Sequence, residues 1–353
     1  MEYIVPGICG IAFGIFAEKG RVHEPMMIRG QMNFQYNVMM KMFLGALFSG
    51  MAIMSILSVA PRRWKSQLSD ARNAYHQCLS GKGLSSFVLG GALLGSGMTI
   101  AGACPGMVLV QVGSFTDNAL YTLAGGFLGV LLYTILEPSI RELFKPSGFY
   151  QHKQLDSGGS YLSTALPLAT IIACAVAGLE VYRPWTADVG ISSGSFFWTA
   201  KAWPPYISGV LIGALQAPLI LSVSDTLSGS GGYCTVLSQL LLTDRLRNAF
   251  PYLAKYKSGL DNWWQVMYIT GAVIGSYLSA QASGSLGQGS PVTLVQALVG
   301  GGLMTFGARM AGGCTSGHGL SGCSLLLVDS FITTAAMFGG AMATYAGMMQ
   351  GFI

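Results

Sequence analysis

Long uncharged stretches separated by short charged segments make up most of the chain. The runs without Asp, Glu, Lys or Arg are residues 3–17, 42–60, 83–116, 118–136, 157–179, 202–224, 226–243, 262–308, 310–328 and 330–353. A membrane-crossing helix needs about 20 consecutive apolar residues. The pattern therefore predicts an all-α, polytopic transmembrane helical bundle with about eight to ten crossings.

Two of these runs do not have the length of whole membrane-crossing helices. Residues 3–17 are too few for one crossing, and residues 83–116 are too many for one crossing and too few for two. Such lengths are typical of helices that break inside the membrane. We therefore expect some crossings to be re-entrant half-helices.

Composition narrows the class of protein further. Only 9% of the 353 residues are charged and 52% are hydrophobic, whereas an ordinary soluble domain has about 25% charged residues. So few charges exclude a soluble enzyme, a nucleic-acid binder or a disordered protein as the leading interpretation. The lipid bilayer is the expected surrounding, and the plasma (inner) membrane the expected location. Pro6 interrupts the first apolar run, so no cleavable signal peptide is expected.

Two Gly-rich segments match each other at an offset of 210 residues. LGGALLGSGMTIAGAC (89–104) and VGGGLMTFGARMAGGC (299–314) share seven of sixteen positions, including four Gly and the pair Cys104 and Cys314. A weaker echo pairs two Gly-x-x-x-Gly motifs, which begin at residues 10 and 209. These matches predict a duplication. We expect a first membrane repeat at 1–160, a connecting transmembrane segment and loop at 161–200, and a second repeat at 201–353.

Loop charges indicate how the two repeats are oriented. Loop 61–84 is basic and its counterpart 284–292 has no charge, whereas loop 18–37 is mixed and its counterpart 244–262 is basic. Basic loops face the cytoplasm. Equivalent loops would then lie on opposite faces, as in the inverted repeats of many transporters. The unduplicated segment 162–182 would be the extra crossing that inverts the second repeat.

Residues that interrupt helices surround both of the repeated cysteines. Gly102 and Pro105 flank Cys104, and Gly312 and Gly313 precede Cys314. A helix break in a membrane is tolerated only where protein or a cavity satisfies the freed backbone groups. A helix that starts there offers unpaired N–H groups to an anion, and a thiol adds a weak contact that suits permeation. The candidate substrate-binding residues are Cys104, Cys314, Cys234, Gly102, Pro105, Gly312, Gly313, Arg309 and His318.

Two polar candidates leave alternatives open. Arg309 stands alone between uncharged runs and is either a functional cation or a partner for helix-end carbonyls. His318 either donates to an anion or braces its loop. The spacing of His and Cys does not match a closed zinc site, so no metal and no cofactor are expected. Cys9, Cys78 and Cys174 are expected to be small buried hydrophobes, and Cys323 a packing residue.

GACPG at 102–106 and GARMAGGCTSGHGLSG at 307–322 resemble the motifs of the sulfur-transport (YeeE/YedE) family. The resemblance implies an inverted-repeat helical protein whose re-entrant segments meet at a central constriction. It also implies uptake of thiosulfate or a related sulfur anion through pore-lining cysteines, and Cys104 and Cys314 match the family's two motif cysteines.

The chain departs from that family in its first re-entrant segment. Family members often have another Cys there, but FGIFAEKGRVHEPMMIRG at 13–30 contains none. His23 or Glu24 falls near the expected place. A carboxylate at that point would disfavour an anion, whereas a protonated His would favour it.

The leading hypothesis is a permease for thiosulfate or a similar small sulfur-containing anion, not an enzyme. One alternative is a soft-metal transporter for Cu(I), since thioether and thiol groups suit that ion. The methionines that suggest it are Met26, Met27, Met32, Met39, Met40 and Met42. Another alternative is an intramembrane thiol enzyme that handles sulfane sulfur, with Arg309 or His318 activating the thiol. A sulfur-carrier protein as partner stays open.

Overall fold

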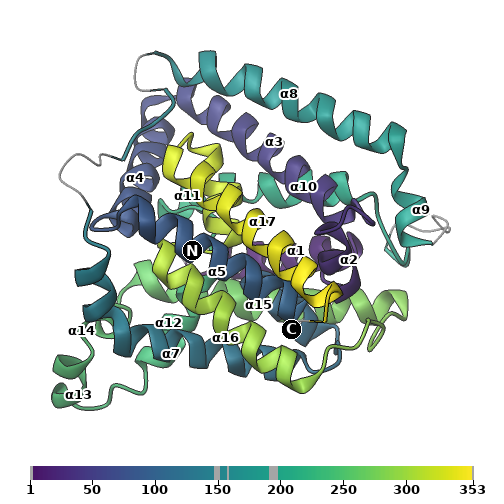
Figure 1. Cartoon of the computed structure of the whole chain (residues 1–353). Helices are drawn as coiled ribbons and strands as arrows, with labels where there is room; N and C mark the ends of the chain where they lie inside the picture. The colour runs from purple at the N-terminus through teal and green to yellow at the C-terminus, as the bar shows by residue number, and fades with distance from the viewer. Residues whose placement is uncertain (1–2, 147–151, 157–158, 191–197, 352–353) are drawn as a thin grey trace.

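The computed structural model describes residues 3–146, 152–156, 159–190 and 198–351. Within these ranges the protein is a helical bundle, and the extended pairing is limited to one isolated bridge between Gln154 and Leu327. Figure 1 shows the long helices running side by side along one diagonal direction. The prediction of an all-α bundle is confirmed.

The first half of the chain forms seven helices. They are α1 (Ile4–Lys19), α2 (Pro25–Gln31), α3 (Val38–Val59), α4 (Arg62–Leu79), α5 (Leu84–Ala101), α6 (Pro105–Gly113) and α7 (Ala119–Leu143). Two further helices, α8 (Tyr161–Tyr182) and α9 (Trp185–Val189), follow. α8 packs along α3 at the edge of the bundle (Figure 1).

The second half forms eight α-helices and one π-helix, η1, which is wound with i→i+5 hydrogen bonds. They are α10 (Pro205–Ala214), α11 (Gln216–Val223), α12 (Ser230–Ser238), α13 (Asp244–Ala249), α14 (Pro251–Ala254), α15 (Leu260–Ser283), α16 (Leu294–Ala311), η1 (Ser316–Gly322) and α17 (Val328–Met349). α6 and α12 have nine residues each, too few to cross a bilayer.

Five described segments are long and apolar enough to cross a membrane. They are Val38–Val59, Leu84–Gly113, Ala119–Leu143, Tyr161–Tyr182 and Pro205–Val223. Three more helices, α15, α16 and α17, have 24, 18 and 22 residues and pack along these segments but are less apolar. The sequence-based expectation of about eight to ten crossings therefore exceeds the five segments that meet both conditions.

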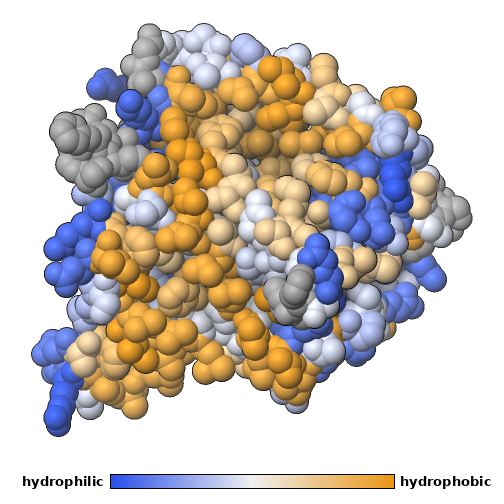
Figure 2. Space-filling model, viewed as in Figure 1, coloured by the Kyte–Doolittle hydropathy of each residue, from blue (hydrophilic) through white to orange (hydrophobic). Residues whose placement is uncertain are grey.

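The outer surface of the bundle is apolar between two polar margins. In Figure 2 hydrophobic residues form a band across the visible face, and hydrophilic residues gather at its left and right margins. Exposed apolar side chains on the long helices include Leu131, Leu132, Ile135, Ile171, Val181 and Leu278. Such a surface requires lipid around it. The chain is an integral membrane protein.

The helix breaks predicted at the repeated cysteines are present. The run 83–116 divides into α5 and α6 around Cys104, and α16 and η1 flank Cys314 in the same way. α5 and α16 have 18 residues each. Both end at a Gly in the left-handed conformation, with φ of 60° at Gly102 and 90° at Gly312. A side chain rarely adopts this φ, so Gly is needed at both ends.

Contacts between α5 and α16 relate the two halves by an approximate twofold axis. A methyl group on Gly90 would lie 2.5 Å from the backbone nitrogen of Ala311, and one on Gly300 would lie 2.4 Å from that of Ala101. These two contacts exchange when 210 residues are added or subtracted. Because they run in opposite chain directions, the helices are antiparallel, and the axis is perpendicular to both. Spanning helices related in this way form an inverted repeat.

The two Gly-x-x-x-Gly motifs also occupy equivalent places. A methyl group on Gly10 would lie 2.1 Å from the carbonyl oxygen of Tyr268, and one on Gly209 would lie 2.1 Å from that of Met42. α1 therefore packs closely on α15, as α10 packs on α3. Small residues permit this approach of helix backbones, which drives association in lipid.

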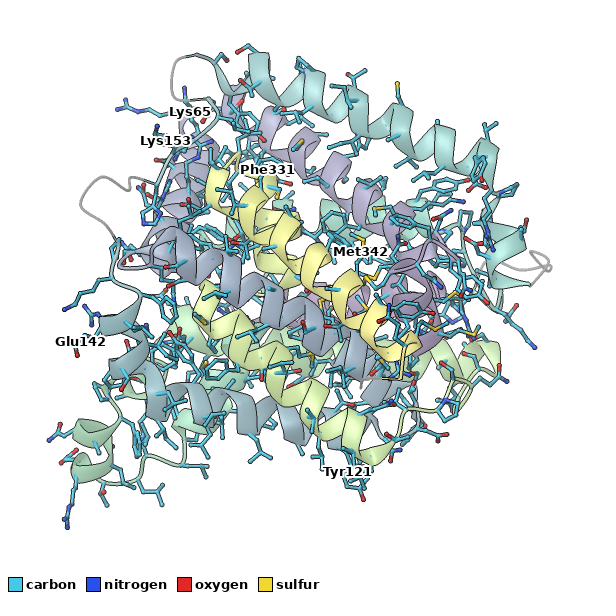
Figure 3. The ribbon with its side chains drawn as sticks, viewed as in Figure 1. Lys65, Tyr121, Glu142, Lys153, Phe331 and Met342 are labelled. Carbon is cyan, nitrogen blue, oxygen red and sulfur yellow. The ribbon has the colours of Figure 1, made fainter. Side chains whose placement is uncertain are left out.

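Basic side chains gather at one end of the bundle. This basic end carries α4, α13 and α14, and Lys65 and Lys153 lie at its margin in Figure 3. The Lys and Arg residues on segments at this end are Arg62, Arg63, Lys65, Arg72, Lys82, Arg141, Lys145, Lys153, Arg245, Arg247, Lys255 and Lys257. Loop 284–292 lies at the opposite end with α2, so loops 61–84 and 284–292 are on opposite sides of the bundle.

The close approach of helix backbones can be tested at Gly95 in α5. Its added methyl group would lie 1.8 Å from the carbonyl oxygen of Met337 in α17, whereas Gly178 in α8 has nothing within 4 Å. We expect Gly95→Ala to lower stability by roughly 1–3 kcal/mol and Gly178→Ala to leave it unchanged. The measurement is the thermal unfolding midpoint of each purified variant in detergent. Equal midpoints would contradict the tight α5–α17 contact.

Candidate functional site

Cys104 lies where α5 ends and α6 begins. Gly102 turns the chain, and a methyl group there would lie 2.5 Å from Cβ of Pro25 at the start of α2. The Gln111 amide donates to the carbonyl oxygens of Gly102, at 2.9 Å, and His23, at 2.7 Å. The break is therefore held by a polar side chain from α6, as the cost of unpaired backbone groups in lipid requires.

The same break is also held from the second half of the chain. Tyr233 in α12 is 1% exposed, and its hydroxyl donates to the carbonyl oxygen of Pro105 at 2.8 Å. Pro105 opens α6, where it needs no hydrogen-bond acceptor of its own. α6 thus begins directly after Cys104, with its first N–H groups beside the thiol.

Cys314 lies at the equivalent break between α16 and η1. Its sulfur is 3.2 Å from the Ser316 hydroxyl, and its carbonyl oxygen accepts from the His318 N–H at 2.8 Å. Cys314 is 1% exposed and Cys104 is 9% exposed. Both thiols belong to the same buried cluster, and Ser316, which contacts the Cys314 sulfur, lines the same cavity as Cys104. The structure therefore brings together the two cysteines that the sequence paired.

The His318 ring is occupied within the protein. Its Nε2 lies 3.2 Å from the carbonyl oxygen of Ala311, and its Nδ1 lies 3.1 Å from the Ser330 hydroxyl and 3.3 Å from that of Tyr75. Because a carbonyl accepts, Nε2 carries a proton. Of the two roles left open for His318, the geometry matches bracing of η1, and the ring is not a free base beside Cys314.

A small apolar cavity adjoins Cys104. This methionine cavity has a volume of about 40 Å³. It is lined by Phe13, Val22, Ile28, Met39, Met42, Phe43, Met98, Cys104, Gly106, Met107, Ile212, Thr315, Ser316 and Leu320. Ser316, which contacts the Cys314 sulfur, reaches the same space. Four thioethers and a thiol thus face one cavity between the two helix breaks.

A larger polar cavity lies toward the basic end and is lined by Arg309 and Gly312, which precede Cys314 in the chain. This polar cavity has a volume of about 420 Å³. It is lined by Ala74, Gln77, Cys78, Lys82, Asp225, Ser228, Gly231, Tyr252, Lys255, Tyr256, Asp261, Asn262, Gln265, Arg309 and Gly312. The cavity therefore combines charged and hydroxyl-bearing side chains, whereas the methionine cavity is almost wholly apolar.

Arg309 borders the polar cavity and contacts the third candidate cysteine. One of its terminal nitrogens donates to the Cys234 sulfur at 3.6 Å and the other to the Ser230 hydroxyl. These contacts differ from the helix-end carbonyls that were one expectation for this side chain. Arg309 instead ties α16 to α12 and places Cys234, which is fully buried, close to the cavity wall.

Two cations that the sequence analysis missed as site residues occupy equivalent places at the breaks. Arg29 donates to the carbonyl oxygens of Thr99, at 3.0 Å, and Ile100, at 2.5 Å. Lys82 donates to those of Arg309, at 2.9 Å, and Met310, at 3.0 Å. The acceptor positions differ by 210 residues, but the donors come from different elements. Each cation neutralises the negative end of a helix next to a cysteine.

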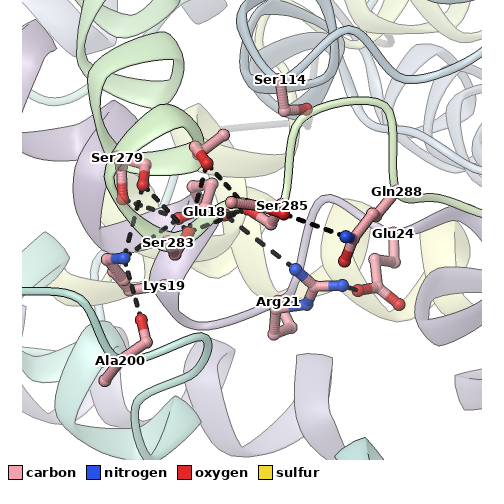
Figure 4. A network of polar contacts seen from close by, with 12 residues as sticks. Glu18, Lys19, Arg21, Glu24, Ser114, Ala200, Ser279, Ser283, Ser285 and Gln288 are labelled. Atoms are coloured by element: carbon pink, nitrogen blue, oxygen red, sulfur yellow. Dashed lines mark hydrogen bonds and ion pairs between the residues drawn. The ribbon is translucent and has the colours of Figure 1, made fainter.

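The first re-entrant segment contains a buried carboxylate instead of a cysteine. Glu18 accepts from the hydroxyls of Ser279 and Ser285, both at 2.6 Å, and lies 3.9 Å from Lys19 and 4.0 Å from Arg21 (Figure 4). The network joins the end of α1 to the end of α15. The carboxylate is thus satisfied within the protein and does not face a substrate path unpaired.

The two residues near the expected cysteine position have different surroundings. Glu24 forms an ion pair with Arg21, which offsets its charge (Figure 4). His23 is 1% exposed, and its Nδ1 has no partner among the described residues. The negative charge that would disfavour an anion at this point is therefore paired.

These breaks and cavities can now be compared with known proteins. The Sulphur transport family matches residues 19–343, most of the chain. The chain belongs to this family. The resemblance read from the two cysteine motifs is confirmed.

Relatives of this Sulphur transport protein are named as transporters. The thiosulfate transporter TsuA of Spirochaeta thermophila is 25% identical over 348 residues, which cover 93% of each chain. The thiosulfate transporter TsuA of Escherichia coli is 25% identical over 270 residues, covering 72% of this chain and 71% of that protein. A probable transporter of Xylella fastidiosa is 26% identical over 154 residues, covering 43% of this chain and 99% of that protein.

The remaining cysteines of this Sulphur transport protein differ in exposure. Cys9 and Cys323 are buried, as expected for packing residues. Cys78 and Cys174 are exposed, so the expectation that they are buried hydrophobes is wrong. Cys174 lies on α8 at the edge of the bundle, and Cys78 lines the polar cavity because α4 ends there.

The capping role of Arg29 gives a stability test. Arg29→Met would leave the carbonyl groups of Thr99 and Ile100 without a donor, so we expect a loss of roughly 2–4 kcal/mol in folding free energy. Arg62→Met, on the exposed part of α4, removes the same charge without removing a cap. The thermal unfolding midpoints of the purified variants provide the measurement. If both variants unfold together with the wild type, Arg29 is not needed at the break.

Proposed function

We propose that this protein is a permease that takes up thiosulfate or a similar small sulfur-containing anion through the Cys104–Cys314 constriction. The observation that carries the proposal is the placement of both thiols at equivalent helix breaks in one buried cluster, with the methionine cavity at Cys104 and the polar cavity at Arg309 and Gly312. The relatives named as thiosulfate transporters support the choice of substrate.

Thiosulfate has the chemistry that such a path requires. Its terminal sulfur is soft and would contact the thiols of Cys104 and Cys314 in turn, while its oxygens accept from N–H groups at the start of α6. A bare anion in hydrocarbon faces a cost of tens of kcal/mol, which N–H groups and sulfur contacts lower. Because each of these contacts is weak, the anion can be released again from the constriction, as permeation requires.

The basic end indicates which face of the protein lies toward the cytoplasm. Basic loops of membrane proteins face the cytoplasm, so the polar cavity would open inward and the α2 end outward. We propose the plasma (inner) membrane as its location. In this orientation residues 1–160 and 201–353 would be the two inverted repeats, joined by 161–200.

Uptake by cysteine variants tests the thiol path. We expect Cys104→Ala and Cys314→Ala each to reduce uptake of radiolabelled thiosulfate into proteoliposomes at least tenfold, because each removes one of two successive sulfur contacts. Cys174→Ala is the matched control, since that thiol lies at the outer edge of the bundle. Wild-type rates in both constriction variants would refute the proposal.

Labelling tests the inverted arrangement. In a Cys78→Ser, Cys174→Ser background, Ser66→Cys lies on α4 and Gln288→Cys in the loop between α15 and α16. We expect a membrane-impermeant maleimide added to intact cells to label only the cysteine at 288, because the basic end faces inward. Labelling of both positions from the same side would contradict the inversion.

The methionine cavity favours a second candidate, permeation of a soft cation such as Cu(I). Thioethers and thiols suit that ion, and Met39, Met42, Met98 and Met107 face Cys104 across the cavity. Competition separates the two candidates. Thiosulfate uptake that is unaffected by Cu(I) favours the anion, whereas copper-dependent uptake of the metal itself favours the cation.

A further inference from the structure

Three cations meet in the polar cavity without a carboxylate partner. Lys82, Lys255 and Arg309 all line it, and among the described parts of the chain none of them takes part in an ion pair. Most other interior cations are paired, as Lys41 is with Glu180. Arg309 is buried, Lys82 is half-buried and Lys255 is exposed. A buried charge such as that of Arg309 is costly without a counter-charge. Asp225 and Asp261 also line the cavity, but among the described residues neither lies within ion-pair distance of these cations, which are left to pair with a bound anion.

The three cations differ in how many hydrogen atoms they have left to donate. The Lys82 ammonium already donates to two carbonyl groups of α16 and lies 3.3 Å from the Tyr133 hydroxyl, so it contributes mainly charge. Arg309 has a buried Nε with no partner. Lys255 lies over the rings of Tyr252 and Tyr256, at 4.7 Å and 5.1 Å, which hold the side chain without occupying its hydrogens.

Repulsion among these cations contributes to lowering the pKa values of the two lysines. Burial, followed by the charges of Arg309 and Lys255, lowers the pKa of Lys82 to about 7. Burial and Arg309 also lower the pKa of Lys255. Burial raises the pKa of Asp225 in the cavity wall to about 6, so this carboxylate is still mostly ionised at neutral pH but pairs with none of the three cations. A bound anion would relieve this repulsion.

We propose that the polar cavity is a binding site for a small sulfur oxyanion, sulfate and sulfite as well as thiosulfate, that works without the thiols. Its free donors are the Arg309 Nε and the Lys255 ammonium, and the amides of Asn262 and Gln265 line the same space. The oxygens of an oxyanion do not need a soft partner such as a thiol, so this site discriminates less among sulfur anions than the constriction does. Its role in transport, as a holding site next to the cysteines, rests on the proposed function; binding itself does not.

Two sources of the oxyanion share this chemistry, a dissolved ion and the phosphate of an anionic lipid. We assign the dissolved ion because the cavity is walled by α4, α12, α15 and α16 and reaches Arg309, which is 7% exposed. A headgroup attached to acyl chains would have to thread between these helices to reach that guanidinium.

Equilibrium binding of radiolabelled sulfate to the purified full-length protein tests the site. In a detergent with a neutral headgroup, we expect saturable binding by the wild type and about 10- to 100-fold weaker binding by Lys255→Gln, since a charge-assisted donor is lost. Lys255→Arg should restore it. Arg245→Gln, an exposed residue of the basic end outside the cavity lining, is the matched control and should bind as the wild type does.

A thiol variant and a change of lipid test whether the site is independent of the cysteines and whether its occupant is a dissolved ion. Cys314→Ala should bind sulfate with wild-type affinity, because the site does not use the constriction. The proposal is overturned if the wild type shows no saturable sulfate binding, if Lys255→Gln and Arg245→Gln bind equally, or if Cys314→Ala abolishes binding. It is also overturned if phosphatidylglycerol in nanodiscs displaces all bound sulfate while phosphatidylcholine does not, since the occupant is then a lipid phosphate.

Failure of this site and failure of the proposed function have different signatures. Thiosulfate uptake that depends on Cys104 and Cys314 in a protein that does not bind sulfate would remove only the cavity site. Sulfate binding that depends on Lys255 in a protein that does not transport thiosulfate would remove only the transport proposal.

Discussion

A helix that breaks inside a membrane leaves backbone carbonyl and N–H groups that lipid cannot satisfy, and the whole centre of this protein is arranged around that cost. Arg29 and Lys82 satisfy the carbonyl ends of α5 and α16, and Gln111 and Tyr233 hold the turn around Cys104. Without these partners the breaks would close into continuous helices or unfold. The cysteines would then have no place from which to meet a solute.

The twofold relation between the repeats governs the backbone more strictly than the side chains. Helix ends, left-handed Gly residues and capped carbonyl groups agree at an offset of 210 residues. The chemistry on either side of the cysteines does not, since one side has thioethers and the other has cations. The duplicated helices are therefore nearly symmetric in their backbones, whereas the side chains that line the two cavities differ.

Sequence reasoning recovered the features that depend on local pattern. The all-α fold, the break at Gly102 and the pairing of Cys104 with Cys314 all follow from run lengths and repetition. The role of Arg29 and Lys82 could not be predicted from the sequence, where they resemble ordinary loop charges. Only tertiary packing brings them to carbonyl groups far along the chain. The exposure of Cys78 was missed for the same reason.

Along the seam between α5 and α16, glycines of each helix, among them Gly90, Gly97, Gly300 and Gly307, lie directly against backbone atoms of the opposite helix. Two rods in such contact resist sliding, since any shift drives backbone into backbone. The repeats are therefore poorly suited to rocking past one another as rigid halves. The seam therefore holds the two halves in one relative position, so motion is expected in the short helices that lie outside it, such as α2 and α12, rather than between the halves.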